Sequence, residues 1–268
     1  MTVTDDSRTY AQEIVRGDVP GGPSTSQTIM VASLRLLLSQ LPAAAAPEDY
    51  RAAVMDQNAL GKQTARGREW AFRQLRRFYG FDPRRVLLFR ALRDLWPDDA
   101  VGQPLLAMLC ALARDPVLRA SSAVIFDKEY GTEVGADDFK SAIEDAFPGA
   151  YRASTRRTAA QNVSSSWQQS GHLLAEGATR KTRCRAESTP ASVAYALLLG
   201  HLQGVRGQAL FETLWARVLD QPASRLIDLA ATASQRGMLE LRHAGGVIEV
   251  GFGELLRPFK ADSQGRLL

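Results

Sequence analysis

The order of the predicted elements after Ala136 constrains the fold more than any other feature of this chain. From there the sequence indicates a helix, a short turn, a long polar helix and a basic segment typical of a hairpin, "LLAEGATRKTRCR". From Leu210 it indicates helix, turn, helix and a β-hairpin, "MLELRHAGGVIEVGF", whose strands flank an "AGG" turn. Both orders are typical of a winged helix-turn-helix. We therefore predict a mainly α-helical protein of winged helix-turn-helix units with small β-hairpin wings.

Polar and Pro/Gly-rich stretches divide the chain into units. Thr189 before Pro190 predicts the N-cap and the first residue of a helix that opens the last unit. We expect the following units: a flexible arm over 1–27, an N-terminal helical domain with a basic helix-turn-helix over 28–135, a winged-helix-like DNA-binding unit over 136–188, a C-terminal winged-helix-like domain over 189–260 and a tail over 261–268.

The polar helix "STRRTAAQNVSSSWQQSGHL", residues 154–173, has almost no apolar face. Ala160, Val163 and Trp167 form a narrow seam that we expect to pack on the domain. No acidic residue occurs in this stretch, whereas helices that only face solvent are usually rich in Glu and Lys. We expect an N-cap at Ser154 or Thr155. We expect the outward face to contain Arg157, Thr158, Gln161, Asn162, Ser165, Gln168 and Gln169.

These side-chain types suit contact with double-stranded DNA. Asn and Gln pair with adenine, Arg pairs with guanine, and the Thr methyl group contacts the thymine methyl group. Ser, Thr and free amides at a helix N-terminus bind phosphate. On this helix the candidate DNA contacts are Ser154, Thr155, Arg156, Arg157, Thr158, Gln161, Asn162 and Ser165. On the wing we expect phosphate clamps at Arg180, Lys181, Arg183 and Arg185.

The charge distribution agrees with this hypothesis. The net charge is only +4, but residues 51–93 carry 11 basic and 3 acidic groups, a net +8, and residues 151–185 carry 7 and 1, a net +6. Residues 94–150 carry 4 basic and 11 acidic groups, a net −7. A basic block is the usual electrostatic signature of a phosphate-binding face, and the alternative is a solvated Arg-rich surface.

The first basic block contains a second candidate DNA-binding helix, "GKQTARGREWAFRQLRRFYG". We expect Trp70, Phe72, Leu75, Phe78 and Tyr79 to face inward and Gly80 to end the helix. We expect the opposite face to contain Lys62, Arg66, Arg73, Arg76 and Arg77. The candidate DNA contacts here are Asn58, Lys62, Gln63, Thr64, Arg66 and Arg73. The alternative is an Arg-rich helix paired with the acidic segment 94–150.

The last helix-turn-helix, with Ser224, Arg225 and Arg236, has a balanced charge. For that unit we favour packing or dimerisation over DNA contact.

The segments "LLLSQL", "MDQNALGKQTARGREWAFRQLRRFY" and "RALRDLW", together with the polar helix, resemble the BrxA family of BREX phage-defence systems. The resemblance covers roughly residues 30–200. It implies a largely helical, winged-helix-type DNA-binding protein without enzymatic activity, an accessory component beside other phage-defence proteins. On matching positions it points to Asn58, Lys62, Arg66, Thr155, Arg156 and Asn162.

Enzymatic signatures are not found in this sequence. His172, His201 and His243 lie in no zinc-binding frame, and no Gly-rich phosphate loop or GxSxG motif occurs. Asp127 and Glu129 beside Lys128 lack the strand-borne spacing of a nuclease site. Cys184 lies among arginines, which lower a thiol pKa, but alone it makes no redox sensor. We expect no enzymatic activity, no metal site and no cofactor.

The predicted function is therefore non-enzymatic binding of double-stranded DNA. Two alternatives remain open: a winged-helix transcription regulator, and an adaptor whose basic faces bind acidic proteins. Two cysteines form no disulfide framework, the polar N-terminus is no secretory signal, and no apolar run spans a bilayer. We expect a cytoplasmic protein with no membrane contact and leave its oligomeric state open.

Overall fold

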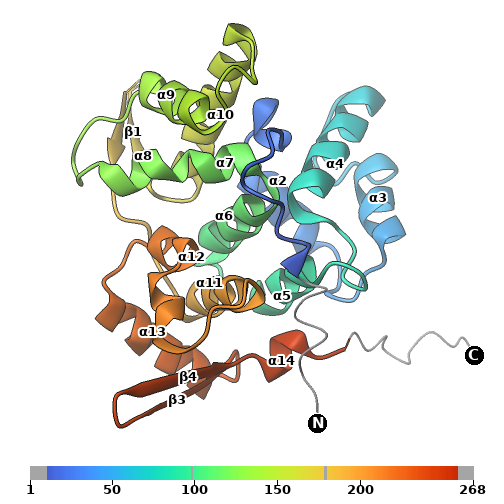
Figure 1. The fold of residues 1–268 in the computed structure, drawn as a ribbon. Helices are drawn as coiled ribbons and strands as arrows, with labels where there is room; N and C mark the ends of the chain where they lie inside the picture. Colours follow the sequence, from blue (N-terminus) through green and yellow to red (C-terminus); the bar gives the residue numbers. More distant parts are fainter. Residues whose placement is uncertain (1–10, 98, 178–179, 259–268) are drawn as a thin grey trace, which may run out of the picture.

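Two strongly apolar helices form the centre of the molecule (Figure 1). They are α6 (Gln103–Arg114) and α11 (Pro190–Leu202), and they pack against each other. Every residue of 105–113 and of 191–200 is buried. A helix that is apolar on all sides must be covered on all sides, so the remaining elements surround this pair.

The computed structural model describes residues 11–97, 99–177 and 180–258. These residues are mainly helical and include two small antiparallel hairpins, which confirms the predicted fold class at this level. No helix among these residues is long and apolar enough to cross a membrane.

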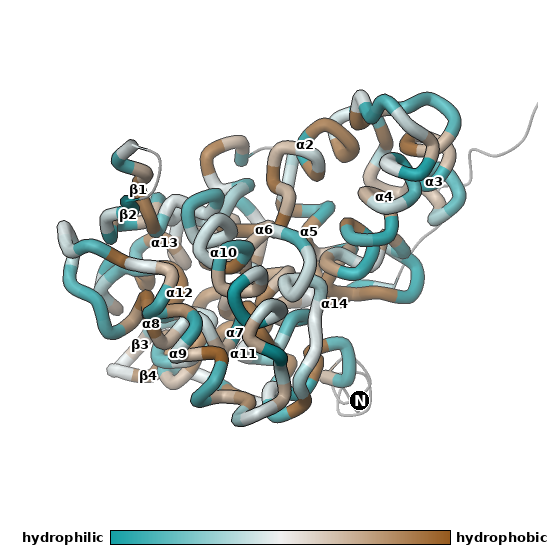
Figure 2. Tube along the Cα trace, turned by 90° about the horizontal axis from the view of Figure 1, so that it is seen from above, coloured by the Kyte–Doolittle hydropathy of each residue, from teal (hydrophilic) through white to brown (hydrophobic). Residues whose placement is uncertain are grey.

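Four helices form the N-terminal half, and they are α2 (Val31–Ser39), α3 (Pro47–Met55), α4 (Ala65–Tyr79) and α5 (Leu87–Leu95). α2, α4 and α5 pack on α6, and α3 packs on α4 and α2. Tyr50 stacks on Phe81 with ring centroids 5.1 Å apart, and Phe89 meets Tyr50 edge-on at 5.4 Å. Figure 2 shows hydrophilic colour along the segments around α3 and α4, at one edge of the molecule.

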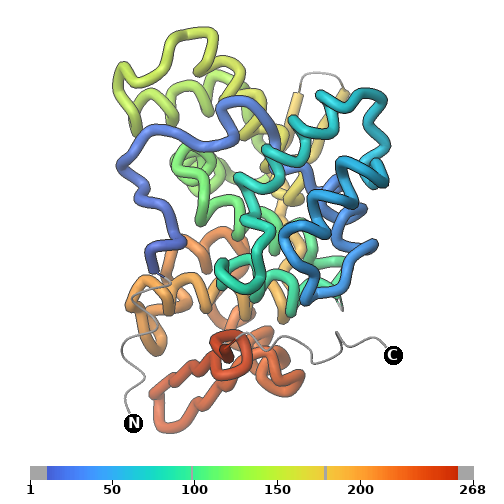
Figure 3. The backbone as a smooth tube through the Cα atoms, turned by 90° about the vertical axis from the view of Figure 1, so that its right-hand side faces the viewer, coloured from blue at the N-terminus to red at the C-terminus, as the bar shows by residue number. Residues whose placement is uncertain are grey.

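We expected a flexible arm over residues 1–27. Residues 1–10, like the expected tail over 261–268, lie outside the described residues, whereas residues 11–27 are attached to the body of the protein. In Figure 3 this segment (blue) climbs along the body from the level of α11 and α12 toward α10. The Glu13 carboxylate accepts the N–H groups of Leu87 and Leu88 at 2.8 and 2.9 Å, which caps the start of α5. Ser24, in the 3₁₀ helix η1 (Pro23–Thr25), is fully buried. The segment is therefore attached to the body at Glu13 and Ser24, while residues 15–20 between them are exposed.

The first helix–turn–helix–hairpin order is present. Three short helices, a long helix and two strands follow one another along the chain. They are α7 (Pro116–Ala120), α8 (Ser122–Asp127), α9 (Ala136–Ala146), α10 (Ala153–Gln169), β1 (Leu173–Glu176) and β2 (Arg180–Arg183). β1 pairs antiparallel with β2, with Leu173 opposite Arg183. An isolated bridge joins Glu133 to Thr182, so residues near 133 pair with the free edge of β2.

The second helix–turn–helix–hairpin order is present as well, beside and below α11 in Figure 1. Thr189 caps α11 by accepting the Ser192 N–H, as predicted, and Pro190 is its first residue. The elements that follow are the 3₁₀ helix η2 (Gly207–Glu212), α12 (Leu214–Val218), α13 (Ala223–Gln235), β3 (Glu240–Ala244), β4 (Val247–Gly251) and α14 (Gly253–Leu256). Gly245 and Gly246 join the two strands with φ of 58° and 79°, which glycine adopts without strain.

Candidate nucleic-acid interface

The polar helix α10 is anchored by the seam that its sequence predicts. Ala160, Val163 and Trp167 are fully buried, and the indole N–H donates to the Ser121 hydroxyl at 2.8 Å. The predicted N-cap is wrong. The cap position is Arg152, which makes no side-chain cap hydrogen bond, so the first amides of α10 have no side-chain cap. Ser154 and Thr155 lie inside the first turn.

One exposed polar stripe runs along α10. Its residues recur every three or four positions, so they lie on one side of the helix. Its members are Ser154, Arg157, Thr158, Gln161 and Gln168, all exposed, with the half-buried Ser165 between them. The Lys181 ammonium of β2 lies 3.4 Å from the Ser165 hydroxyl, and burial lowers the pKa of this lysine. The β1–β2 hairpin therefore borders the polar stripe at Ser165.

Two residues expected on the outward face instead hold the chain together. The Asn162 amide donates to the Ser24 carbonyl at 3.0 Å, and the Gln169 side-chain oxygen accepts the Val31 N–H at 3.0 Å. Between them, the Ser166 hydroxyl accepts the Ile29 N–H at 3.1 Å. Asn162 and Gln169 are already engaged by backbone groups of segment 24–31 and are not part of the exposed stripe.

Two expected DNA-binding arginines are paired with acidic residues of the preceding segment. Arg156 forms an ion pair with Glu144 of α9. Arg180 lies 3.3 Å from the Glu133 carboxylate, and both side chains are more than half exposed. A surface pair of this kind is weak, so Arg180 is available to exchange its partner for a phosphate. The Arg156 pair instead fixes the α9–α10 turn.

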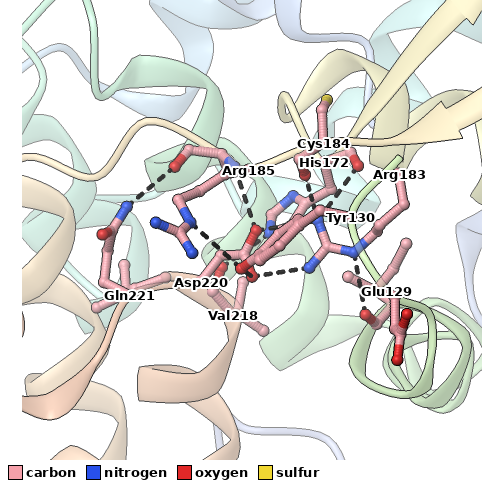
Figure 4. A network of polar contacts seen from close by, with 12 residues as sticks. Glu129, Tyr130, His172, Arg183, Cys184, Arg185, Val218, Asp220 and Gln221 are labelled. Carbon is pink, nitrogen blue, oxygen red and sulfur yellow. Dashed lines mark hydrogen bonds and ion pairs between the residues drawn. The ribbon is translucent and has the colours of Figure 1, made fainter. Parts of the chain in front are cut away.

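Arg183 is not a phosphate clamp, because it lies inside the molecule (Figure 4). Only 4% of its side chain is exposed, and its guanidinium binds both Asp220 oxygens, at 2.7 and 2.9 Å. It also donates to the Ile125 carbonyl at 3.1 Å. β2 presents this position to the interior, since strand residues alternate between faces. Arg183 therefore joins the first hairpin to the turn between α12 and α13.

The same junction contains His172, Tyr130 and Arg185. His172 donates from Nε2 to the Val218 carbonyl at 2.8 Å, and burial lowers its pKa to about 4. The Arg185 side chain is exposed and lies over the Tyr130 ring, 4.7 Å from its centroid. The neighbouring arginines do not lower the Cys184 pKa as expected, because partial burial outweighs them and raises it.

The basic helix α4 presents its arginines as predicted. Thr64 caps it by accepting the Gly67 N–H at 3.0 Å, and Gly80 ends it with a φ of 94°. Phe72, Leu75, Phe78 and Tyr79 are buried, whereas Trp70 is only half-buried. The exposed basic face contains Arg66, Arg73, Arg76 and Arg77, with Gln63 and Thr64 exposed just before it and Lys62 half-buried.

Asn58, expected to contact DNA, shapes the turn before α4. Its φ is 53°, and its side-chain oxygen accepts the Lys62 N–H at 2.8 Å. Asn tolerates the left-handed region better than most residues, which explains the residue type without a ligand.

The alternative in which α4 pairs with the acidic segment 94–150 is wrong for the described residues. Among them, no α4 arginine forms an ion pair with a carboxylate of that segment. The carboxylates near α10 bind Lys128, Lys140, Arg156 and Arg180 instead. The positive charge of α4 is therefore not neutralised by this part of the protein.

Segment 24–31 brings the two basic helices onto one side of the molecule. α10 binds it in order through Asn162, Ser166 and Gln169, as described above. α4 binds it in the same order, because Gln74 accepts the Ser26 hydroxyl at 3.5 Å and Tyr79 donates to the Ile29 carbonyl at 2.5 Å. The two helices therefore lie on either side of η1 and contact segment 24–31 in the same chain order (Figure 1). On α4, Trp70 lies one turn before Gln74, which contacts Ser26 just after η1. On α10, Thr158 lies one turn before Asn162, which contacts Ser24 of η1.

No three His, Cys, Asp or Glu side chains within the described ranges are close enough to hold a metal ion. Comparisons of the chain with protein-family models, with curated proteins and with solved structures gave no match.

Proposed function

We propose that this chain is a non-enzymatic, double-stranded DNA-binding protein, with α10 in the major groove and the β1–β2 hairpin beside the backbone. The observation that carries the proposal is the exposed polar stripe of α10. It offers Arg, Gln, Thr and Ser side chains, contains no carboxylate and is bordered by a lysine of the wing. These are the groups that read base edges and bind phosphate.

The order of elements supports a winged helix-turn-helix for this unit. α8, α9, α10 and the hairpin follow one another, and residues near 133 pair with β2 to add a third, minimal strand. In such a unit the second helix of the helix–turn–helix pair enters the groove while the wing lies over the backbone.

α4 supplies the rest of the proposed binding surface. Its exposed arginines lie on the other side of η1 from α10, and Trp70 lies among them. Arginines increase affinity through phosphate contacts whose strength falls with salt, and an aromatic ring adds an apolar contact. The accessory role in phage defence is part of the proposal only through the BrxA resemblance.

Fluorescence anisotropy with a random-sequence duplex across a salt series tests the proposal. The test variant is Arg157→Gln with Gln161→Ala, since both side chains are exposed on α10. The matched control is Arg225→Gln with Gln235→Ala, the same residue types exposed on α13. We expect salt-dependent binding by the wild type and a loss of about 1–3 kcal/mol per base contact only in the α10 variant.

Two outcomes would contradict this assignment. Equal loss in both variants would mean that the α10 stripe has no special role. Absence of binding at low salt would favour an adaptor whose basic faces bind acidic proteins. A strong preference for a palindromic duplex would keep the DNA proposal and identify a transcription regulator.

A further inference from the structure

A cleft beside the C-terminal end of α4, which shares Arg76 with the basic face of that helix, is lined by arginines from separate parts of the chain. Its volume is about 660 Å³, within the range of roughly 300–1,000 Å³ that is typical of small-molecule sites. Arg51 comes from α3, Arg76 from α4, Arg84 and Arg85 from the α4–α5 connection, and Arg114 from the end of α6.

The lining of this cleft contains more basic than acidic side chains. The only acidic residues in its lining are Glu48 and Asp82, so five arginines against two carboxylates give a net +3. Asp82 is already engaged, because one of its oxygens accepts the N–H groups of Arg84 and Arg85 at 3.1 and 3.2 Å. Its other oxygen is 4.0 Å from the Arg85 guanidinium, a distant pair.

The donors that remain point to an anion with several oxygens. Arg51 and Arg76 are exposed, and their guanidinium groups make no hydrogen bond or ion pair among the described residues. Arg114 uses only Nε, which donates to the Arg77 carbonyl at 3.2 Å, so its two terminal nitrogens are available. A planar guanidinium binds two oxygens of one phosphate at once, which makes arginine the preferred residue for this group.

We infer that this cleft binds phosphate groups, supplied either by a free multiply charged phosphate compound or by the backbone of bound DNA. The convergence of four chain segments on one net-positive cleft carries the inference. A bound polyanion would supply negative charge that the lining of the cleft lacks. The inference does not depend on the role proposed for α10.

Two probes are used. Binding of inorganic triphosphate is measured by titration calorimetry at low salt, and binding of the random-sequence duplex is measured by fluorescence anisotropy. The test variant is Arg51→Gln with Arg76→Gln, and the control is Arg225→Gln with Arg236→Gln, which removes the same charge from exposed positions on and beside α13. Equal melting temperatures show that the variants are folded. We expect triphosphate to bind the wild type and the control, and to bind the cleft variant about tenfold more weakly or worse, since at least one charge-assisted hydrogen bond is lost.

The two sources of phosphate give different patterns. Loss of triphosphate binding with unchanged DNA affinity identifies a free phosphate compound. A decrease of roughly 2 in the slope of log affinity against log salt for DNA, in the cleft variant only, identifies backbone phosphates in the cleft, because loss of Arg76 from the α4 basic face alone would account for a decrease of only about 1. The inference is overturned if neither probe distinguishes the cleft variant from the control. Failure of the α10 proposal leaves the triphosphate result unaffected, so the two failures are distinguishable.

Discussion

Arg180 and Arg183 lie three positions apart on β2 and have opposite environments. Arg180 is 64% exposed beside a carboxylate that is itself 58% exposed, whereas Arg183 is 4% exposed and binds an Asp220 side chain that is 9% exposed. Coulomb attraction is weak in water and strong in the interior, where each charge also depends on its partner. Residue type alone therefore does not tell which arginine contacts a ligand.

Removing the buried charge should be far more costly than removing the exposed one. We expect Arg183→Met to lower the free energy of unfolding by about 3–5 kcal/mol, because it leaves the Asp220 carboxylate buried without its partner. The control, Arg180→Met, should change it by about 1 kcal/mol or less. Urea denaturation measures both values, and similar losses in the two variants would contradict the buried ion pair.

Adjacent positions on α10 have different roles at the scale of the helix. Gln161 is exposed on the polar stripe, whereas the amide of Asn162 donates to the Ser24 carbonyl. One residue is a rotation of about 100° around a helix, which is enough to move a side chain from the solvent to a packed neighbour. α10 therefore combines an exposed polar side with a side that holds segment 24–31.

These two positions give a paired test. We expect Asn162→Ala to lower the free energy of unfolding by about 1 kcal/mol, the typical contribution of one hydrogen bond. We expect Gln161→Ala to change stability by less than about 0.5 kcal/mol and to weaken DNA binding. Thermal denaturation and anisotropy on both variants measure this. A larger stability loss for Gln161→Ala than for Asn162→Ala would reverse the assigned helix faces.

The whole molecule is joined through a buried polar junction between its two helix–turn–helix–hairpin units. His172 follows α10 and donates to the Val218 carbonyl of α12, while Arg183 of β2 binds Asp220 beside it (Figure 4). The Trp167 ring meets the His172 ring edge-on, with centroids 4.8 Å apart. The relative position of the two units therefore depends on a neutral histidine and a charged aspartate.

This junction makes stability depend on pH. Burial lowers the His172 pKa from 6.5 to about 4, so between these values the unfolded chain binds a proton that the folded chain does not. The contribution of His172 to the free energy of unfolding is complete above about pH 6.5. It decreases by about 1.4 kcal/mol per pH unit on acidification toward pH 4. Urea denaturation across this range should show the slope. It should be smaller in His172→Asn than in His243→Asn, where the exposed His243 serves as control.

A second titration acts at lower pH. Burial alone would raise the Asp220 pKa, but hydrogen bonds and charge from Arg183, with a further bond from Tyr130, lower it overall. A carboxyl group whose pKa is lower in the folded protein stabilises the folded state at pH values above its unfolded pKa. This stabilisation is lost as the pH falls through the folded pKa. The loss of stability on acidification should therefore begin with His172 and with His201, whose pKa burial also lowers to about 4, and continue with this aspartate.

The sequence by itself determined the elements whose signals are local. The seam of Ala160, Val163 and Trp167, the Thr189 cap, the Gly80 stop and the glycine turn of the second hairpin depend on neighbours within a few residues, and all are present. The mainly helical class follows from the same periodicities.

Only the tertiary structure decided which polar side chains are available to a ligand. In the sequence, Arg183, Asn162 and Gln169 cannot be told from the exposed Arg157 and Gln161, because they are of the same or similar residue types. Their partners lie far away in the chain and are Asp220, Ser24 and Val31. The convergence of Arg51, Arg76 and Arg114 on one cleft is equally non-local. The physical reason is that local periodicity fixes where a side chain lies on its own helix or strand. Burial and pairing depend on which distant segment packs against it.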